Sequence, residues 1–83
     1  MKFIAEINVM PHKNLLDPQG KAVTGTMASI GLSQVQNVRV GKHITIEIEA
    51  SSEEEAKTKT DEACRKLLAN PVMEFYEFTI HQV

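Results

Sequence analysis

The sequence has one cysteine, no tryptophan and few aromatic residues among its 83 positions. With Cys64 as the only thiol, neither an internal disulfide nor a multi-cysteine metal site is possible. An excess of positive charge is also missing, because nine basic residues are scattered among eleven acidic ones and the formal net charge is −2. Nucleic-acid-binding modules draw most of their affinity from phosphate neutralisation, so we expect no nucleic-acid partner.

Long hydrophobic runs are absent as well. Residues 1–10 carry a lysine and a glutamate within their apolar stretch, which argues against a signal peptide and a membrane span. We therefore expect a cytoplasmic protein without membrane contact. The apolar share of 42% is typical of a globular chain. A chain of this length predicts one domain, residues 1–83, whose modest core is supplemented by association with other chains.

Apolar periodicity predicts a chain in which strands and helices follow one another through short turns. Phe3, Ile7 and Val9 alternate with polar residues, which is the period of a half-buried strand. The predicted strands cover residues 2–10, 38–40, 43–49 and 72–81, and the predicted helices cover residues 18–30 and 53–69. Asp17 is a suitable N-cap for the first helix, and Ser52 has capping-box spacing to Glu55 at the start of the second.

The predicted order β-α-β-β-α-β is typical of an α+β, ferredoxin-like sandwich, in which two helices cover one face of an antiparallel sheet. Only Gly41 and Lys42 separate the second and third predicted strands, and this favours a tight hairpin. On the sheet face without helices, the alternation places Ile4, Met10 and Phe75 among polar residues. A sheet seldom leaves so many large apolar groups in water, so we expect an oligomer contact there, in a homodimer or homotetramer.

No group of residues has the spacing of an active site. The three histidines lie on separate predicted elements and lack a second ligand at metal-like spacing. Cys64 falls on the apolar stripe of the second helix, which is typical of a small core side chain. Arg39 and Arg65 are the only arginines, and neither lies in the first strand-to-helix loop, where an acylphosphatase-like enzyme holds a phosphoryl group. We predict no catalytic, cofactor-binding or metal-binding residue.

Two local features remain as candidate contacts with a partner protein. The first is a compact positive point at the predicted hairpin, suited to an acidic partner surface, although a solvated hairpin tip is an alternative. The second is a rigid entry into the first helix, for which simple capping is an alternative. Their residues are Arg39, Gly41 and Lys42 for the first, and Asp17, Pro18 and Gly20 for the second.

Three segments, taken together, resemble the PurS family. They are residues 16–23 (LDPQGKAV), 35–42 (VQNVRVGK) and 67–76 (LLANPVMEFY). Each segment alone is unspecific, but their order and spacing in a chain of this length are specific. The resemblance covers essentially the whole chain, although the region 51–65 matches only in pattern.

The resemblance implies a non-catalytic small subunit of phosphoribosylformylglycinamidine synthase, in de novo purine biosynthesis. That enzyme converts formylglycinamide ribonucleotide to its amidine with ATP and glutamine. In this family a glutaminase subunit, PurQ, releases ammonia, and a large synthetase subunit, PurL, adds it to the activated amide. The small subunit is implied to form homo-oligomers, to bridge PurL and PurQ and to support ammonia transfer. It has no cofactor of its own, while the complex uses ATP and Mg²⁺.

The last matching segment adds Asn70, Glu74 and Tyr76 to the candidate partner contacts. An alternative interpretation of the whole chain is a ferredoxin-like regulatory domain that binds a small ligand at a dimer interface. A third is a small phosphoryl-transferring or hydrolytic enzyme, against which the missing phosphate cradle counts. Without the resemblance, the residues alone predict only an oligomeric α+β domain.

Overall fold

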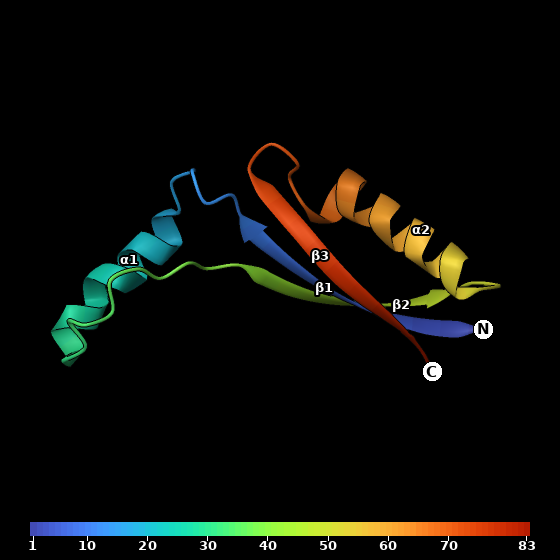
Figure 1. The fold of residues 1–83 in the computed structure, drawn as a ribbon, viewed down its shortest axis with the longest axis horizontal. Helices are drawn as coiled ribbons and strands as arrows, with labels where there is room; N and C mark the ends of the chain where they lie inside the picture. Colours follow the sequence, from blue (N-terminus) through green and yellow to red (C-terminus); the bar gives the residue numbers. More distant parts are fainter.

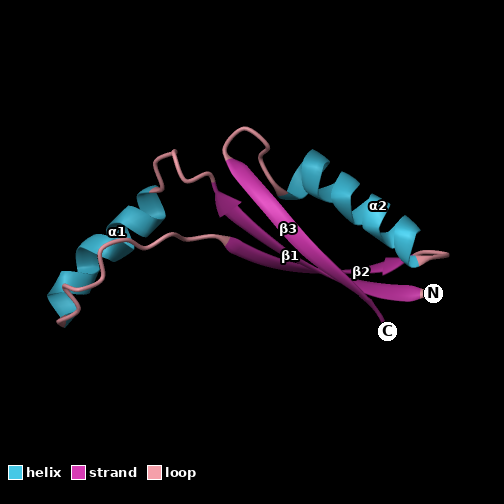
Figure 2. Cartoon of the chain, viewed as in Figure 1, coloured by secondary structure: helices cyan, strands magenta, loops and turns pink.

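The computed structural model describes residues 1–83 and has the α+β architecture expected from the sequence, with an antiparallel sheet and two helices (Figures 1 and 2). Three strands form the sheet, and a short 3-10 turn and a π turn extend the two helices. The elements are β1 (Lys2–Pro11), α1 (Pro18–Met27), η1 (Ala28–Ile30), β2 (Lys42–Glu49), α2 (Glu53–Ala63), η2 (Cys64–Leu68) and β3 (Glu74–Gln82). None of the helices has the length and apolarity needed to cross a bilayer.

The central strand of the sheet is β1, which pairs antiparallel with both neighbours in the order β2-β1-β3. In this register Ala5 lies opposite Ile46 on β2 and Ile80 on β3. The strict alternation of β1 places four of its side chains on one face, where all are buried: Phe3, Ala5, Ile7 and Val9. The predicted strand period is therefore confirmed, and β1 forms the centre of the core.

Helix α2 covers that buried face (Figure 1). It presents Ala56 and Thr60 to the sheet, and Cys64 follows at the start of η2, all three without exposed surface. Ser52 caps it as expected, since its hydroxyl accepts a hydrogen bond from the backbone N–H of Glu55 at 3.2 Å. Burial raises the pKa of the Cys64 thiol, because the thiolate would lose its hydration. The interpretation of Cys64 as a core side chain is confirmed.

The predicted second strand and its hairpin are wrong. Residues 35–41, here called the arm, belong to no strand and run beside α1. The backbone N–H of Val38 donates to the hydroxyl of Thr24, and that of Val40 donates to the carboxylate of Asp17, both at 2.9 Å. Because α1 takes these two donors, the arm has no strand partner within the chain.

Helix α1 also lies elsewhere than the prediction placed it. Together with the arm, it projects beyond the end of the sheet on the side where β1 ends, while α2 and its η2 extension pack on the strands (Figures 1 and 2). The molecule is consequently elongated, with principal extents of 51 × 26 × 14 Å. The ferredoxin-like class is retained, but within one chain the sheet has three strands and one covering helix, whereas the prediction had four strands and two covering helices.

Candidate protein–protein interface

Three segments that are far apart in the sequence meet at the end of the sheet from which α1 projects. They are the loop 12–17, the arm, and the turn 70–74; we call their joint exposed area the sheet-end surface. The backbone N–H of His12 donates to the carbonyl of Met73 at 2.9 Å, and the guanidinium of Arg39 donates to the carbonyl of Pro11. These bonds fix the first loop between the other two segments.

Asp17 joins α1 to the arm. One carboxylate oxygen accepts from the N–H of Gly20 at 3.0 Å, as expected for an N-cap, and the other accepts from the N–H of Val40. Hydrogen bonds from Gly20 and Val40, with the nearby charge of Arg39, lower the pKa of this carboxyl group below its usual range. Asp17 is therefore charged at neutral pH and occupied on both oxygens.

Gly20 allows α1 and the arm to approach closely. It is buried, and a Cβ atom at this position would clash with the carbonyl oxygen of Val38 and with the Asp17 carboxylate. Thr24, one turn later, donates to the carbonyl of Gly20 at 2.8 Å while accepting from Val38. The predicted rigid helix entry thus extends across the arm, and α1 and the arm form one unit.

Asn70 and Glu74 shape the turn that leads into β3. The N–H of Asn70 donates to the Glu74 carboxylate at 2.8 Å, and the Asn70 side chain accepts from the N–H of Val72 at 3.0 Å. The second Glu74 oxygen lies 3.8 Å from the ammonium of Lys42 at the start of β2. Asn70, Glu74 and Lys42 are thus close together, as a shared contact surface requires.

Tyr76 lies away from this surface. It is on the sheet face covered by α2, where its hydroxyl donates to the carboxylate of Asp61. This bond raises the pKa of Tyr76 and, together with the Arg65 guanidinium, lowers that of Asp61. Tyr76 therefore connects β3 to α2.

Exposed apolar side chains at the sheet-end surface were missed by the sequence reasoning. Leu16 is 69% exposed and Val72 is 80% exposed, and Leu15 and Met73 beside them are also exposed. Leu15, Leu16 and Met73 line one shallow hollow with Pro11. The only signal in the sequence was large apolar residues inside turn-rich segments, where no periodicity assigns them to a core. A patch of this kind, rimmed by Lys42 and Glu74, is typical of a docking surface.

The open face of the sheet is more polar than expected. Met10 lies opposite Phe75, and the ring of Phe75 lies 5.8 Å from that of His12. Ile4 lies near the other end of β1, on the same face but in line with His81. The predicted oligomer residues therefore fall into two separate places.

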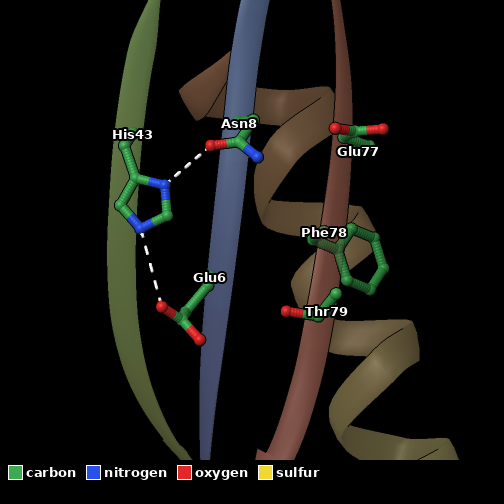
Figure 3. A pocket seen from close by; sticks show the side chains of 6 residues that line it. All are labelled: Glu6, Asn8, His43, Glu77, Phe78 and Thr79. Carbon is green, nitrogen blue, oxygen red and sulfur yellow. Dashed lines mark hydrogen bonds and ion pairs between the residues drawn. The ribbon is translucent and has the colours of Figure 1, made fainter.

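Polar side chains occupy the middle of that face (Figure 3). The imidazole of His43 makes a 2.7 Å hydrogen bond to Asn8 and lies 3.8 Å from the carboxylate of Glu6. Glu6 also lies 3.7 Å from His81 on the opposite neighbouring strand. The structure has no group of three or more His, Cys, Asp or Glu residues that could hold a metal ion.

Comparison with known proteins identifies the family. Residues 4–82 match the family model of PurS, phosphoribosylformylglycinamidine (FGAM) synthase. The chain belongs to the PurS family. It is 37% identical over 81 residues to the PurS subunit of Bacillus subtilis, covering 98% of this chain and 95% of that one. It is 33% identical to the PurS subunit of Methanocaldococcus jannaschii, with 98% of both chains covered.

Solved PurS structures have the same fold. Bacillus subtilis PurS superposes with a TM-score of 0.87 at 35% identity, over 96% of this chain and 99% of that one. A chain of the structure of PurLQS from Thermotoga maritima also gives 0.87, at 33% identity, over 98% of this chain and 99% of that one. Because nearly the whole chain is covered, the likeness includes the projecting α1 and the arm. The resemblance seen in the sequence is confirmed, and the family favours a synthase subunit over a regulatory domain.

Proposed function

We propose that this PurS chain is the small bridging subunit of a phosphoribosylformylglycinamidine synthase, and that it joins a PurL-like synthetase to a PurQ-like glutaminase. The observation that carries the proposal is the likeness, over nearly the full length, to a chain of the Thermotoga maritima PurLQS structure. In this function the chain contributes binding free energy and no reacting group. ATP and Mg²⁺ are used by the synthetase, and the complex works in the cytoplasm.

Bridging matters because the two enzymes share a reactive intermediate. Ammonia released by the glutaminase is lost by protonation or diffusion unless the synthetase site is close and correctly oriented. A subunit that binds both enzymes makes transfer an intramolecular step at a high effective concentration. The rate of glutamine-dependent synthesis then depends on the stability of the docked state.

The sheet-end surface is the proposed contact with one of the two enzymes. Its exposed leucine, valine and methionine side chains are carried on a backbone that hydrogen bonds between three segments hold in place. A preformed apolar patch loses little conformational entropy on binding, which favours tight association. The charged rim made by Lys42 and Glu74 gives the contact its orientation.

A second copy of the chain is the proposed partner of α1. The outer edge of β2 has no neighbour, and α2 packs on β1 and β3, which leaves Ile44, Ile46 and Ile48 only half-buried. One side of α1, which projects beyond the sheet (Figure 1), forms an apolar groove that includes Val23 and Met27. Packing α1 and the arm of one copy on the β2 side of another completes the four-stranded, two-helix fold that the sequence predicts.

Reconstitution with PurL-like and PurQ-like subunits tests the bridging function. We expect the double variant Leu16→Asp/Val72→Asp to reduce glutamine-dependent synthesis by about tenfold or more, since buried anchors carry most interface energy. Synthesis driven by added ammonium salt should be unchanged, because the synthetase site is not altered. Val83→Asp, an equally exposed apolar residue at the other end of β3, is the matched control.

The outcomes separate the parts of the proposal. Full glutamine-dependent activity of the double variant would show that the sheet-end surface is not the contact. Full activity of the two enzymes in the absence of this chain would refute the bridging function itself. Co-elution of the three chains on size-exclusion chromatography gives an independent measure of assembly.

A further inference from the structure

Most basic side chains of this protein are neutralised by carboxylates. Five of the nine lie within 4.0 Å of an acidic side chain: Lys2, Lys42, Lys59, Arg65 and Lys66. Of the remaining four, Lys57 lies on α2, and the other three line a single hollow of about 500 Å³. Three of the four basic side chains without a carboxylate within 4.0 Å are therefore concentrated in one place.

The three cations of this hollow are Lys13, Lys21 and Arg39, which come from the first loop, from α1 and from the arm. No sequence window contains all of them. Arg39 reaches the first loop because the arm folds back along α1, and its guanidinium is held there by the carbonyl of Pro11. The sequence argument held that neither arginine lies in this loop, which is correct, but the fold brings the Arg39 side chain to its start.

The frame of the hollow is rigid before any ligand arrives. The bonds of Asp17 and Thr24 to the backbone of the arm fix the distance between its two walls. Asp17 is the only acidic residue of the lining, and both of its oxygens already accept backbone donors. The lining therefore keeps two net positive charges, and the one carboxylate present does not occupy the donors of the lysines.

We propose that this hollow binds the phosphate group of a small phosphorylated molecule. A phosphate monoester carries about two negative charges near neutral pH, which matches the net charge of the lining, and a diphosphate carries about one more, whereas a single carboxylate would leave one cation unpaired. Arg39 offers a planar fork of donors, and the two lysines add mobile point charges. The volume lies within the range of small-ligand sites, and the amides of Gln36 and Asn37 on the arm side provide polar groups for the rest of the molecule.

The proposed site goes beyond the bridging function and does not depend on it. It lies on the side of the loop 12–17 that faces α1, and it shares only Leu15 and Leu16 with the apolar hollow of the sheet-end surface. Binding of a phosphorylated molecule would add contacts between the loop, α1 and the arm. A ligand that favours this arrangement stabilises the unit formed by α1 and the arm.

Titration of the full-length chain at constant ionic strength tests the site. The probes are inorganic phosphate, ADP and adenosine, followed by calorimetry and by amide chemical shifts in solution. We expect saturable binding of phosphate and ADP, with the largest shifts at residues 13–25 and 36–39, and no saturable binding of adenosine. Arg39→Gln should weaken ADP binding about tenfold, as for a lost charged hydrogen bond. Lys21→Gln should weaken it about threefold, since a lysine acts there as an exposed point charge.

Lys57→Gln is the matched control, because Lys57 is the one cation outside the hollow that has no carboxylate partner. Should Arg39→Gln disturb the loop through its bond to Pro11, Lys21→Gln still tests the site, since no bond to the frame involves the Lys21 side chain. If Lys57→Gln weakened ADP binding as much as Arg39→Gln and Lys21→Gln do, the binding would reflect non-specific electrostatic attraction and the proposal would be overturned. It would also be overturned by equal affinity for adenosine and ADP, by the absence of saturable binding, or by tighter binding of an oligoglutamate peptide at the same residues, which would indicate a docking surface for acidic proteins.

Discussion

Single residues in this protein make contacts that the neighbouring sequence does not predict. Asp17 was predicted as an N-cap from its position before Pro18, and its bond to Gly20 confirms this. Its second bond, to Val40, joins residues 23 positions apart and has no local signal. An N-cap can be predicted from the sequence because its hydrogen bond lies within one turn of helix. A bond between distant segments depends on where tertiary packing places the arm.

Thr60 shows the opposite situation, a polar atom without a partner. It is completely buried between α2 and the sheet, and its hydroxyl makes no hydrogen bond. Burying an unsatisfied hydroxyl is unfavourable, so we expect Thr60→Val, which keeps the shape, to stabilise the fold by about 1 kcal/mol. Thermal unfolding should then shift upward by about 4–8 °C.

The control for this change is Thr60→Ala, which also removes the hydroxyl but leaves a small cavity. It should stabilise less than Thr60→Val, or destabilise, because the core loses packing contacts. If Thr60→Val lowers the melting temperature instead, the hydroxyl has a partner that contributes to stability, such as a buried water molecule.

At the scale of elements, the strands of the sheet were predictable, and so were the starts of both helices. Strict alternation in β1 and β2 assigns each side chain to a face, and only one assignment buries most of the apolar groups. The arm has the same alternation in Val38 and Val40, but it is only a few residues long. With so short a pattern, two hydrogen bonds donated by its backbone to Thr24 and Asp17 are enough to decide which neighbour the arm packs against.

The sheet-end surface was predictable only in part, for a related reason. Asn70, Glu74 and Lys42 were selected from the sequence and do lie together, because turn residues occur where strands begin and end. Tyr76 follows the same turn, yet strand alternation directs it to the covered face. The exposed leucines were missed because apolar residues in loops show no period from which exposure follows.

The junction between α1 and the arm can be tested with two glycines of the same helix. Gly20→Ala should destabilise the protein by about 1–3 kcal/mol, because the added methyl group would overlap the Val38 carbonyl and the Asp17 carboxylate. Gly25→Ala is the matched control, since nothing lies within 4 Å of a Cβ there. The control should stabilise by about 0.5–1 kcal/mol through the lower entropy of the unfolded chain.

Two measurements report on this pair. Chemical denaturation gives the change in the free energy of unfolding, and amide hydrogen exchange of Val38 and Val40 shows whether the arm has separated from α1. We expect faster exchange at both amides in Gly20→Ala alone. The same change in both variants would mean that helix propensity, and not the close approach of the arm, determines the effect.

At the scale of the whole molecule, the shape is too extended for a self-sufficient domain. Its radius of gyration is 16.4 Å, whereas a compact chain of this length has a value of about 12 Å. The excess comes from α1 and the arm, which project beyond the sheet (Figure 1). An isolated helix of ten residues is marginal in water, so packing on another surface is needed to keep it folded.

The proposal that a second copy of the chain provides this surface can be tested by measuring the mass in solution. The wild-type chain should have at least the mass of a dimer by light scattering, and Val23→Asp/Met27→Asp should reduce the mass to that of a monomer. Two carboxylates in the apolar groove of α1 cannot be buried against Ile44, Ile46 and Ile48 of another copy without a large desolvation cost. In the monomer, hydrogen exchange of α1 should increase, while that of β1 stays slow because α2 still covers it. Val83→Asp, an exposed apolar residue at the far end of β3, should leave the mass unchanged. A dimer that persists in the α1 variant would assign the contact to the open sheet face around Met10 and Phe75 instead.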